Sequence, residues 1–192
     1  MRRRGWRLKG GLGVLAIGAV VLAAVAGRMT GNAGAQDVSA GALLRGTAGQ
    51  VVGTATFSQE GNAVRVTATV QGMPAGFHGF HIHTVGLCEA DNAFMSAGGH
   101  YNPGMHDHAD HAGDQPILYV KADGTGALSF LTDRYSVAEL LRGDPHALMV
   151  HALADNFGNI PERYAPSGPD ETTRSTGDAG ARIACGVIQA GK

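Results

Sequence analysis

The sequence predicts an all-β fold, an antiparallel sandwich or barrel with two long loops. Thirty of the 192 residues are glycine and only 6% are aromatic, a composition that favours short strands and turns over a helical bundle. Short runs of β-branched or alternating residues recur between turn signals, as in antiparallel sandwiches and barrels. Residues 84–115 and 155–181 contain few apolar runs, and loops of such length in a compact domain are usually functional.

The first part of the predicted domain contains a hairpin. Residues 36–48 are small and polar, which indicates a linker or the beginning of a first strand. Residues 51–58 are rich in β-branched side chains, and residues 63–70 alternate valine or alanine with polar side chains. The turn-forming residues 59–62 separate these two runs, so the pattern predicts an antiparallel pair.

The later elements follow from the same signals. We expect further extended segments at residues 78–83, 117–120, 127–131, 147–151 and 182–188. The Asp123-Gly124 turn joins two of them into a second hairpin. Residues 136–141 predict a single helical turn, and no internal repeat is visible.

Charge is distributed unevenly along the chain. Residues 1–35 hold six basic residues and no acidic one, whereas residues 36–192 hold nine basic and sixteen acidic residues, a net charge of −7. A nucleic-acid-binding protein would show a basic patch on its folded part, so this class of protein is excluded.

The N-terminal segment resembles a secretory leader. A basic stretch, MRRRGWRLK, precedes eighteen uncharged residues, 10–27, and Ala33-Gly34-Ala35 fits a cleavage site. We therefore expect a signal peptide at residues 1–35 and one folded domain at residues 36–192. An uncleaved membrane anchor is the alternative, because eighteen residues are just long enough to span a bilayer.

Both alternatives place the domain outside the cytoplasm, as a secreted, periplasmic or cell-envelope protein. Disulfides are stable in that compartment. The chain has two cysteines, Cys88 and Cys185, which allow one bridge or two free buried thiols.

All nine histidines lie between His78 and His151. On a strand, residues i and i+2 share a face and stand roughly 6.6 Å apart along the chain. His81 and His83 therefore point to one side and reach one metal ion, while Phe80 and Ile82 face the core.

A second group of metal-ligand side chains follows within fourteen residues of His100, and one more histidine, His151, ends an apolar strand. This group comprises His106, His108, His111 and Asp114. Imidazole suits copper and zinc, and a carboxylate completes a zinc tetrahedron. Histidine clusters also occur as nonspecific metal-binding tracts or without any ligand role.

With these histidines in this order, the chain resembles the copper/zinc superoxide dismutases over about residues 44–188. Two segments carry the resemblance, GFHGFHIH at 76–83 and GDAGARIACGVI at 177–188. The stretch VHALADNFGNIPERY at 150–164 is most similar to bacterial, especially actinobacterial, members. The resemblance implies an eight-stranded Greek-key antiparallel β-barrel with two long loops, which agrees with the strands predicted above.

The resemblance also implies roles for individual residues. Asp155 would hydrogen-bond a copper-ligating and a zinc-ligating histidine, Arg182 would be the active-site arginine, and a disulfide would join Cys88 to Cys185. The implied copper ligands are His81, His83, His100 and His151. The implied zinc ligands are His100, His108, His111 and Asp114, so that His100 would bridge both metals.

The chain departs from the family pattern in its loops. Only two residues separate His108 from His111, so the zinc loop is short. That leaves open a copper-only enzyme, and also a site in which His106 replaces His108. The second loop has no lysine between His151 and Arg182, so the lysine guidance of substrate found in many relatives is not expected.

The implied activity is the dismutation of superoxide to dioxygen and hydrogen peroxide by a redox-cycling copper beside a structural zinc. His100 would leave the reduced copper, take up a proton and return it, and Arg182 would dock the superoxide anion. The alternative is a non-catalytic copper- or zinc-binding module with the same fold. The sequence is compatible with a monomer or a homodimer, and with membrane attachment only if the leader stays uncleaved.

Overall fold

The computed structural model describes residues 39–191, so the predicted leader and its cleavage site lie outside the described residues. Its strands are β1 (Ser39–Gly46), β2 (Val51–Glu60), β3 (Ala63–Val70), β4 (Gly76–His78), β5 (Phe80–His83), β6 (Leu118–Val120), β7 (Gly126–Thr132), β8 (Ala147–His151), β9 (Arg182–Val187) and β10 (Gln189–Ala190). The helices are α1 (Val137–Leu140), α2 (Glu171–Thr176) and the 3-10 turns η1 (Ala90–Asn92) and η2 (Met95–Ala97). Within the described range, no helix has the length and hydropathy of a membrane span.

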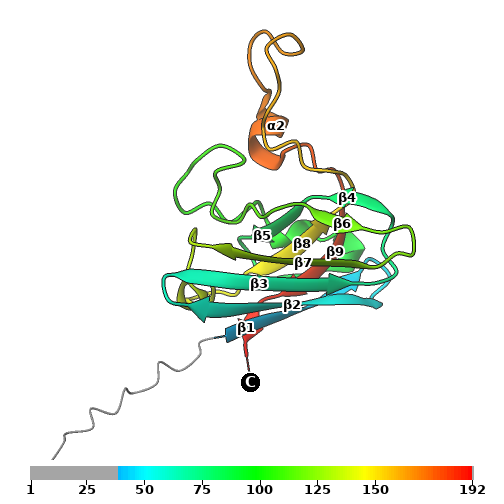
Figure 1. Ribbon diagram of the computed structural model, residues 1–192, viewed down its shortest axis with the longest axis vertical. Coiled ribbons are helices and arrows are strands. Elements are labelled where there is room, and N and C mark those ends of the chain that lie inside the picture. Colours follow the sequence, from blue (N-terminus) through cyan, green and yellow to red (C-terminus); the bar gives the residue numbers. More distant parts are fainter. Residues whose placement is uncertain (1–38, 192) are drawn as a thin grey trace, which may run out of the picture. The chain divides into compact units, whose positions relative to one another are not determined.

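The strands form one antiparallel sheet in the order β4-β6-β7-β3-β2-β1-β9-β8-β5, with β10 paired to β1 (Figure 1). The strands at the two ends of this order, β4 and β5, are consecutive in the chain and separated only by Gly79. The sheet therefore curls into a nearly closed barrel, which confirms the all-β prediction. The expected eight strands are recovered when β4 and β5 are counted as one and the two-residue β10 as an addition.

The barrel interior is filled by the inward faces of the alternating strands. On β3 the alternation is as predicted, with one face buried and the other partly or fully exposed. The largest fully buried apolar side chains include Phe57, Phe80, Leu44, Ile82 and Leu148. Burying each such side chain stabilises the fold by about 1.5–3 kcal/mol, so the barrel provides a firm support for the loops.

Residues 39–46 form β1, so the structure confirms the second alternative for this segment, the beginning of a first strand. Ala40, Ala42 and Leu44 are buried on one face of this strand. Alanine and glycine have low strand propensity, which is why the sequence left a linker open as the other alternative. The strand forms because it pairs with β2 on one side and with β9 and β10 on the other.

The helical elements were partly predicted. The turn expected at residues 136–141 is α1, and Ser136 and Glu139 form a reciprocal capping box at its start. Helix α2 lies in the second long loop, where no helix was predicted. Asp170 caps its N-terminus and Gly177 its C-terminus, but its threonine- and serine-rich sequence has low helix propensity.

Both long loops emerge from the same end of the barrel (Figure 1). The first loop returns to the free edge of β5, where Ile82 N donates to Gly113 O and Tyr101 N donates to Ile82 O. Isolated bridges pair His81 with Asp114 and His83 with His100. The ends of this loop thus cover an edge strand and bring its side chains beside the histidines of β5.

Candidate metal centre

Strands β5 and β8 supply three histidines. All four residues of β5 are buried, and Phe80 and Ile82 belong to the barrel core, as the alternation predicted. His81 and His83 lie on the other face, where the His151 ring at the end of β8 meets both of them, with ring centroids 4.8 Å and 5.5 Å away. The antiparallel pairing of β5 with β8 therefore brings together residues seventy positions apart.

These three residues form a buried cluster with His100 from the first loop. Each of the four offers one ring nitrogen, and the four nitrogens lie within 4.8 Å of one another. The rings of His81 and His100 are closest, with centroids 4.0 Å apart. The structure thus brings together the four histidines that the resemblance assigned to copper.

A second cluster surrounds the carboxylate of Asp114. His81, His100, His108 and Asp114 also offer atoms within 4.8 Å of one another. His111 Nδ1 lies 3.3 Å from both His100 Nδ1 and Asp114 Oδ1, so this residue belongs to the cluster as well. All four residues assigned to zinc are therefore adjacent, and His100 is common to both clusters.

The ring nitrogens of these clusters fit metal ions. Within residues 39–191, the buried side-chain atoms without a hydrogen-bond partner are His81 Nδ1, His100 Nε2 and His108 Nδ1. Leaving buried polar atoms unpaired is costly, and a metal ion would satisfy them. Four imidazoles suit copper, and three imidazoles with one carboxylate suit a tetrahedral zinc.

Asp155 orients one histidine of each cluster. Its carboxylate is buried and accepts hydrogen bonds from His81 Nε2 at 2.7 Å and from His108 Nε2 at 2.8 Å. The backbone N–H of Phe157 donates to it as well, at 2.7 Å. These bonds fix the tautomer of both rings, so that Nδ1 of each ring remains available to a metal ion.

Two rings of the first cluster, the copper-side cluster of His81, His83, His100 and His151, are oriented by backbone carbonyls. These carbonyls bind Nδ1, whereas Asp155 binds Nε2. His83 Nδ1 donates to Gly98 O at 2.9 Å, and His151 Nδ1 donates to Gly180 O at 3.1 Å. The free nitrogens are then His83 Nε2 and His151 Nε2, which lie 3.3 Å apart. These two nitrogens thus converge on one point.

Electrostatics prepare the copper-side histidines to bind a cation. Burial lowers the pKa of His100 to about 4 and the pKa of His151 to about 3. Burial, followed by the charge of His100, holds the pKa of His83 well below its usual value. These rings are therefore neutral at pH 7, the form that a metal requires.

In the second cluster, the zinc-side cluster around Asp114, the pKa values are shifted by neighbouring charges as well as by burial. Burial opposes the charged form of His108, but the carboxylates of Asp114, 3.0 Å from His108 Nδ1, and of Asp155 outweigh it and raise the pKa of His108 to about 9. Burial likewise opposes the ionised form of Asp114, yet the surrounding imidazoles lower its pKa far below its usual value. An ionised carboxylate thus lies beside several imidazoles, ready to balance a divalent cation.

Three histidines lie outside both clusters. His106 is exposed, and its backbone is hydrogen-bonded to the side chain of Asn102. His78 and His146 are buried, with ring nitrogens beside backbone carbonyls of Pro74 and His151 and of Leu140, respectively. The structure therefore places His108, rather than His106, beside Asp114.

An open pocket of about 590 Å³ leads to the copper-side cluster. His83, His100, His151 and Arg182 contribute to its lining. Arg182 Nη1 donates to Phe94 O at 2.7 Å, and its Nη2 donates to Gly98 O at 2.6 Å. The guanidinium is therefore held rigidly beside three of the clustered histidines.

A disulfide joins Cys88 to Cys185, as the resemblance implied. It links the first loop to β9, three residues after Arg182. The loop segment that it secures includes Phe94 and Gly98, whose carbonyls hold the arginine. The bridge thus fixes both the arginine and its acceptors.

Sequence reasoning missed part of this pocket. Its remaining lining residues are Met95 and Gly99 of the first loop and Thr172, Ser175, Thr176, Asp178 and Gly180 of the second. The hydroxyl groups of α2 could have been noticed only if the helix had been predicted, because the short helix places three of them on the pocket side.

Comparisons with known proteins agree with this geometry. Residues 51–188 match the family described as copper/zinc superoxide dismutase (SODC). Superoxide dismutase [Cu-Zn] of Mycobacterium tuberculosis is 42% identical over 82% of this chain and 72% of its own length. The protein of the same name from Mycolicibacterium paratuberculosis is 45% identical over 77% of this chain and 73% of its own length.

A solved structure has the same fold. Cu/Zn superoxide dismutase from Brucella abortus superposes with a TM-score of 0.62 at 28% identity, over 79% of this chain and 99% of that chain. The family match covers most of the domain, and the mycobacterial relatives exceed 40% identity over most of the chain. The chain therefore belongs to the copper/zinc superoxide dismutase family, and it is an enzyme of that family with copper and zinc as cofactors.

Proposed function

We propose that the two clusters form one dismutase centre, with copper held by His81, His83, His100 and His151. Zinc is held by the second set, His100, His108, His111 and Asp114. The observation that carries this proposal is the position of His100. Its Nδ1 lies 2.9 Å from Asp114 Oδ1, whereas its Nε2 is buried without a partner. The same residue also belongs to the group of His81, His83 and His151. One ring thus serves two metal sites.

The chemistry requires one electron to be exchanged at a time. Two superoxide anions and two protons give dioxygen and hydrogen peroxide, and bound copper supplies the alternating one-electron oxidation and reduction. His100 contributes a proton at Nε2, because this nitrogen has no hydrogen-bond partner in the protein and its residue lines the pocket from which superoxide arrives. The zinc-side groups around its Nδ1 keep the ring in place while Nε2 gains and loses its proton.

Arg182 docks the substrate. It lines the same pocket as His83, His100 and His151 and keeps N–H donors beyond the two that bind Phe94 O and Gly98 O. A planar guanidinium suits a small oxyanion. Its fixed position lets it attract superoxide without reorganising.

The enzyme acts outside the cytoplasm. The basic and apolar composition of residues 1–35 and the Cys88–Cys185 disulfide support this proposal. Cleavage after Ala35 would leave residues 36–192 as the mature protein. N-terminal sequencing of the protein recovered from the cell envelope or the medium tests this, and recovery of the uncleaved chain in membranes would instead indicate an anchor.

The deciding experiment is the decay of superoxide followed by stopped flow, with the purified protein loaded with copper and zinc. We expect rapid catalytic decay, which His151→Ala abolishes and Arg182→Ala slows. His106→Ala is the matched control and should leave the decay unchanged, since this exposed histidine belongs to neither cluster. Metal content measured on the same samples should show one copper and one zinc per chain. Full occupancy without decay above the buffer background would contradict the proposal.

A further inference from the structure

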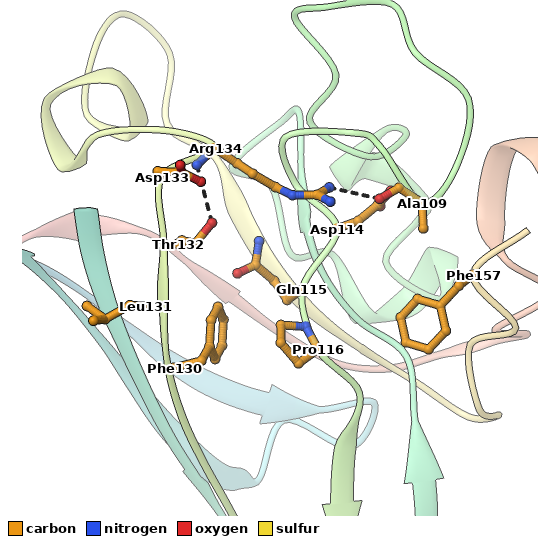
Figure 2. A pocket seen from close by; sticks show the side chains of 10 residues that line it. All are labelled: Ala109, Asp114, Gln115, Pro116, Phe130, Leu131, Thr132, Asp133, Arg134 and Phe157. Carbon is orange, nitrogen blue, oxygen red and sulfur yellow. Dashed lines mark hydrogen bonds between the residues drawn. The ribbon is translucent and has the colours of Figure 1, made fainter. Parts of the chain in front are cut away.

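The zinc-side loop is held from outside by an arginine that the mechanism does not use. Arg134 lies in the connector 133–136 between β7 and α1. Its Nη1 donates to Ala109 O and to His111 O, both at 2.8 Å. Figure 2 shows this side chain extended toward the loop, with the bond to Ala109 drawn. One guanidinium thus binds the backbone of a zinc-side residue directly.

A pocket of about 450 Å³ lies between the loop and the barrel, with Phe130, Pro116 and Phe157 in its lining (Figure 2). Asp114 and Arg134 line the same pocket. The two hydrogen bonds of Arg134 therefore restrain the loop beside this space, in addition to the backbone hydrogen bonds that residues 113–115 make with β5.

The next residue of the connector holds the other end of the loop. Tyr135 is buried, and its hydroxyl donates to Gln115 Oε1 at 3.0 Å. Gln115 is buried in turn and bonded to Gly113 O and to Phe80 O. Arg134 and Tyr135 therefore secure both ends of residues 109–115, the segment that carries His111 and Asp114.

The connector is itself fixed to the barrel. Val137 N donates to Gln59 Oε1 on β2 at 2.9 Å. Ser136 and Glu139 close the capping box of α1 immediately after Tyr135. The restraint on the loop is therefore transmitted from a rigid part of the fold.

We propose that Arg134, supported by Tyr135, is a positioning residue of the zinc half of the centre. It fixes the backbone at Ala109 and His111, so that His111 Nδ1 and the Asp114 carboxylate converge beside the segment that pairs with β5. This inference rests on the proposed zinc ligands. The contacts of Arg134 lie on the zinc side, whereas the copper-side rings are held by Asp155, Gly98 and Gly180.

The test measures metal affinities of the full chain, stripped of metal and titrated against a competing chelator. Arg134→Gln should weaken zinc binding by about 10–100-fold, the usual effect of removing a group that orients a ligand, and change copper affinity less than about threefold. Arg134→Lys should restore only part of the zinc affinity, because the ammonium group keeps a charged donor but cannot reproduce the planar set of donors. Tyr135→Phe should show a smaller loss of the same kind. Arg142→Gln is the matched control, since Arg142 is exposed and lines neither pocket.

Cobalt(II) placed in the zinc site provides a second measurement, because its visible absorption reports the geometry of the site and does not change with loss of stability alone. Its visible absorption should change in Arg134→Gln and remain unchanged in Arg142→Gln. Equal zinc affinities in wild type and Arg134→Gln would overturn the inference, and so would a parallel loss of copper and zinc. A wild type that binds no zinc would instead overturn the proposed zinc ligands, which separates the two failures.

Discussion

At the scale of single residues, the centre depends on which nitrogen each histidine ring leaves free. The i, i+2 spacing on β5 was enough to predict that His81 and His83 share a face. It could not predict that His81 leaves Nδ1 free while His83 leaves Nε2 free, because Asp155 and Gly98 decide this from distant parts of the chain. Neighbours of this kind are visible only once the loops are placed.

Asp155 is the residue whose loss should affect both metals at once. Asp155→Asn removes a carboxylate that accepts hydrogen bonds from His81 and His108, so both rings lose their preferred tautomer. We expect copper and zinc affinity each to fall by about 10–100-fold, as measured by chelator competition. Asp107→Asn, on an exposed residue next to His108 in the first loop, is the control. A loss confined to one metal would show that Asp155 does not link the two halves.

The metal-free protein should be most stable near pH 6.5. Burial lowers the pKa of His100 to about 4 and of His151 to about 3, from 6.5 in an unfolded chain. Below pH 6.5 the unfolded chain therefore binds more protons, and the free energy of unfolding falls as the pH drops toward 4. The raised pKa of His108, about 9, has the opposite effect. Its contribution to the free energy of unfolding is lost as the pH rises from 6.5 to 9.

Thermal denaturation of the metal-free protein across this pH range measures the effect. His151→Gln should reduce the slope on the acidic side, whereas His106→Gln should keep the wild-type profile. A melting temperature that stays constant between pH 4 and pH 6.5 would rule out the inferred burial of neutral histidines.

At the scale of elements, the sequence predicted most strands but not all of the pieces that complete the site. Valine alternation marks β3 because its pattern is intrinsic to the strand. β1 could be predicted only as one of two alternatives, and α2 was missed, because such small or hydroxyl-bearing residues form these elements only when partners stabilise them. The partners are β2 and β9 for β1, and the caps Asp170 and Gly177 for α2. Arg134 gave no signal, since its acceptors are backbone carbonyls twenty-three and twenty-five residues away.

The disulfide links an element to a loop, and its loss should affect both stability and catalysis. Cys88→Ser opens a link across 97 residues and should lower the free energy of unfolding by about 2–5 kcal/mol. It also frees the segment whose carbonyls hold Arg182, so superoxide decay should slow even below the melting temperature. Chemical denaturation and stopped flow measure the two effects. Reduced wild-type protein should behave like the variant, and an unchanged stability would contradict a supporting role for the bridge.

At the scale of the whole molecule, the barrel and the charge distribution have opposite consequences for an anionic substrate. The nearly closed barrel holds both loops at one end, and a pocket leads to the clustered histidines. Residues 36–192 carry a net charge of −7, which repels superoxide at long range. Near the pocket, Arg182 and the bound metal ions supply positive charge that acts at short range.

The dependence of the rate on salt decides which of these fields controls the approach of superoxide. We expect the second-order rate constant to fall between about 0.01 M and about 0.1 M salt, as the Debye length shrinks from about 30 Å to about 10 Å, because screening weakens the attraction at the pocket. Arg182→Met should be slower at low salt and should lose this dependence or reverse it, since the remaining far field is repulsive. Arg142→Met makes the same change in net charge at an exposed position that does not line the pocket, so it should retain the wild-type dependence. A wild-type rate that rises with salt would mean that the overall negative charge, and not the local field of Arg182, governs the encounter.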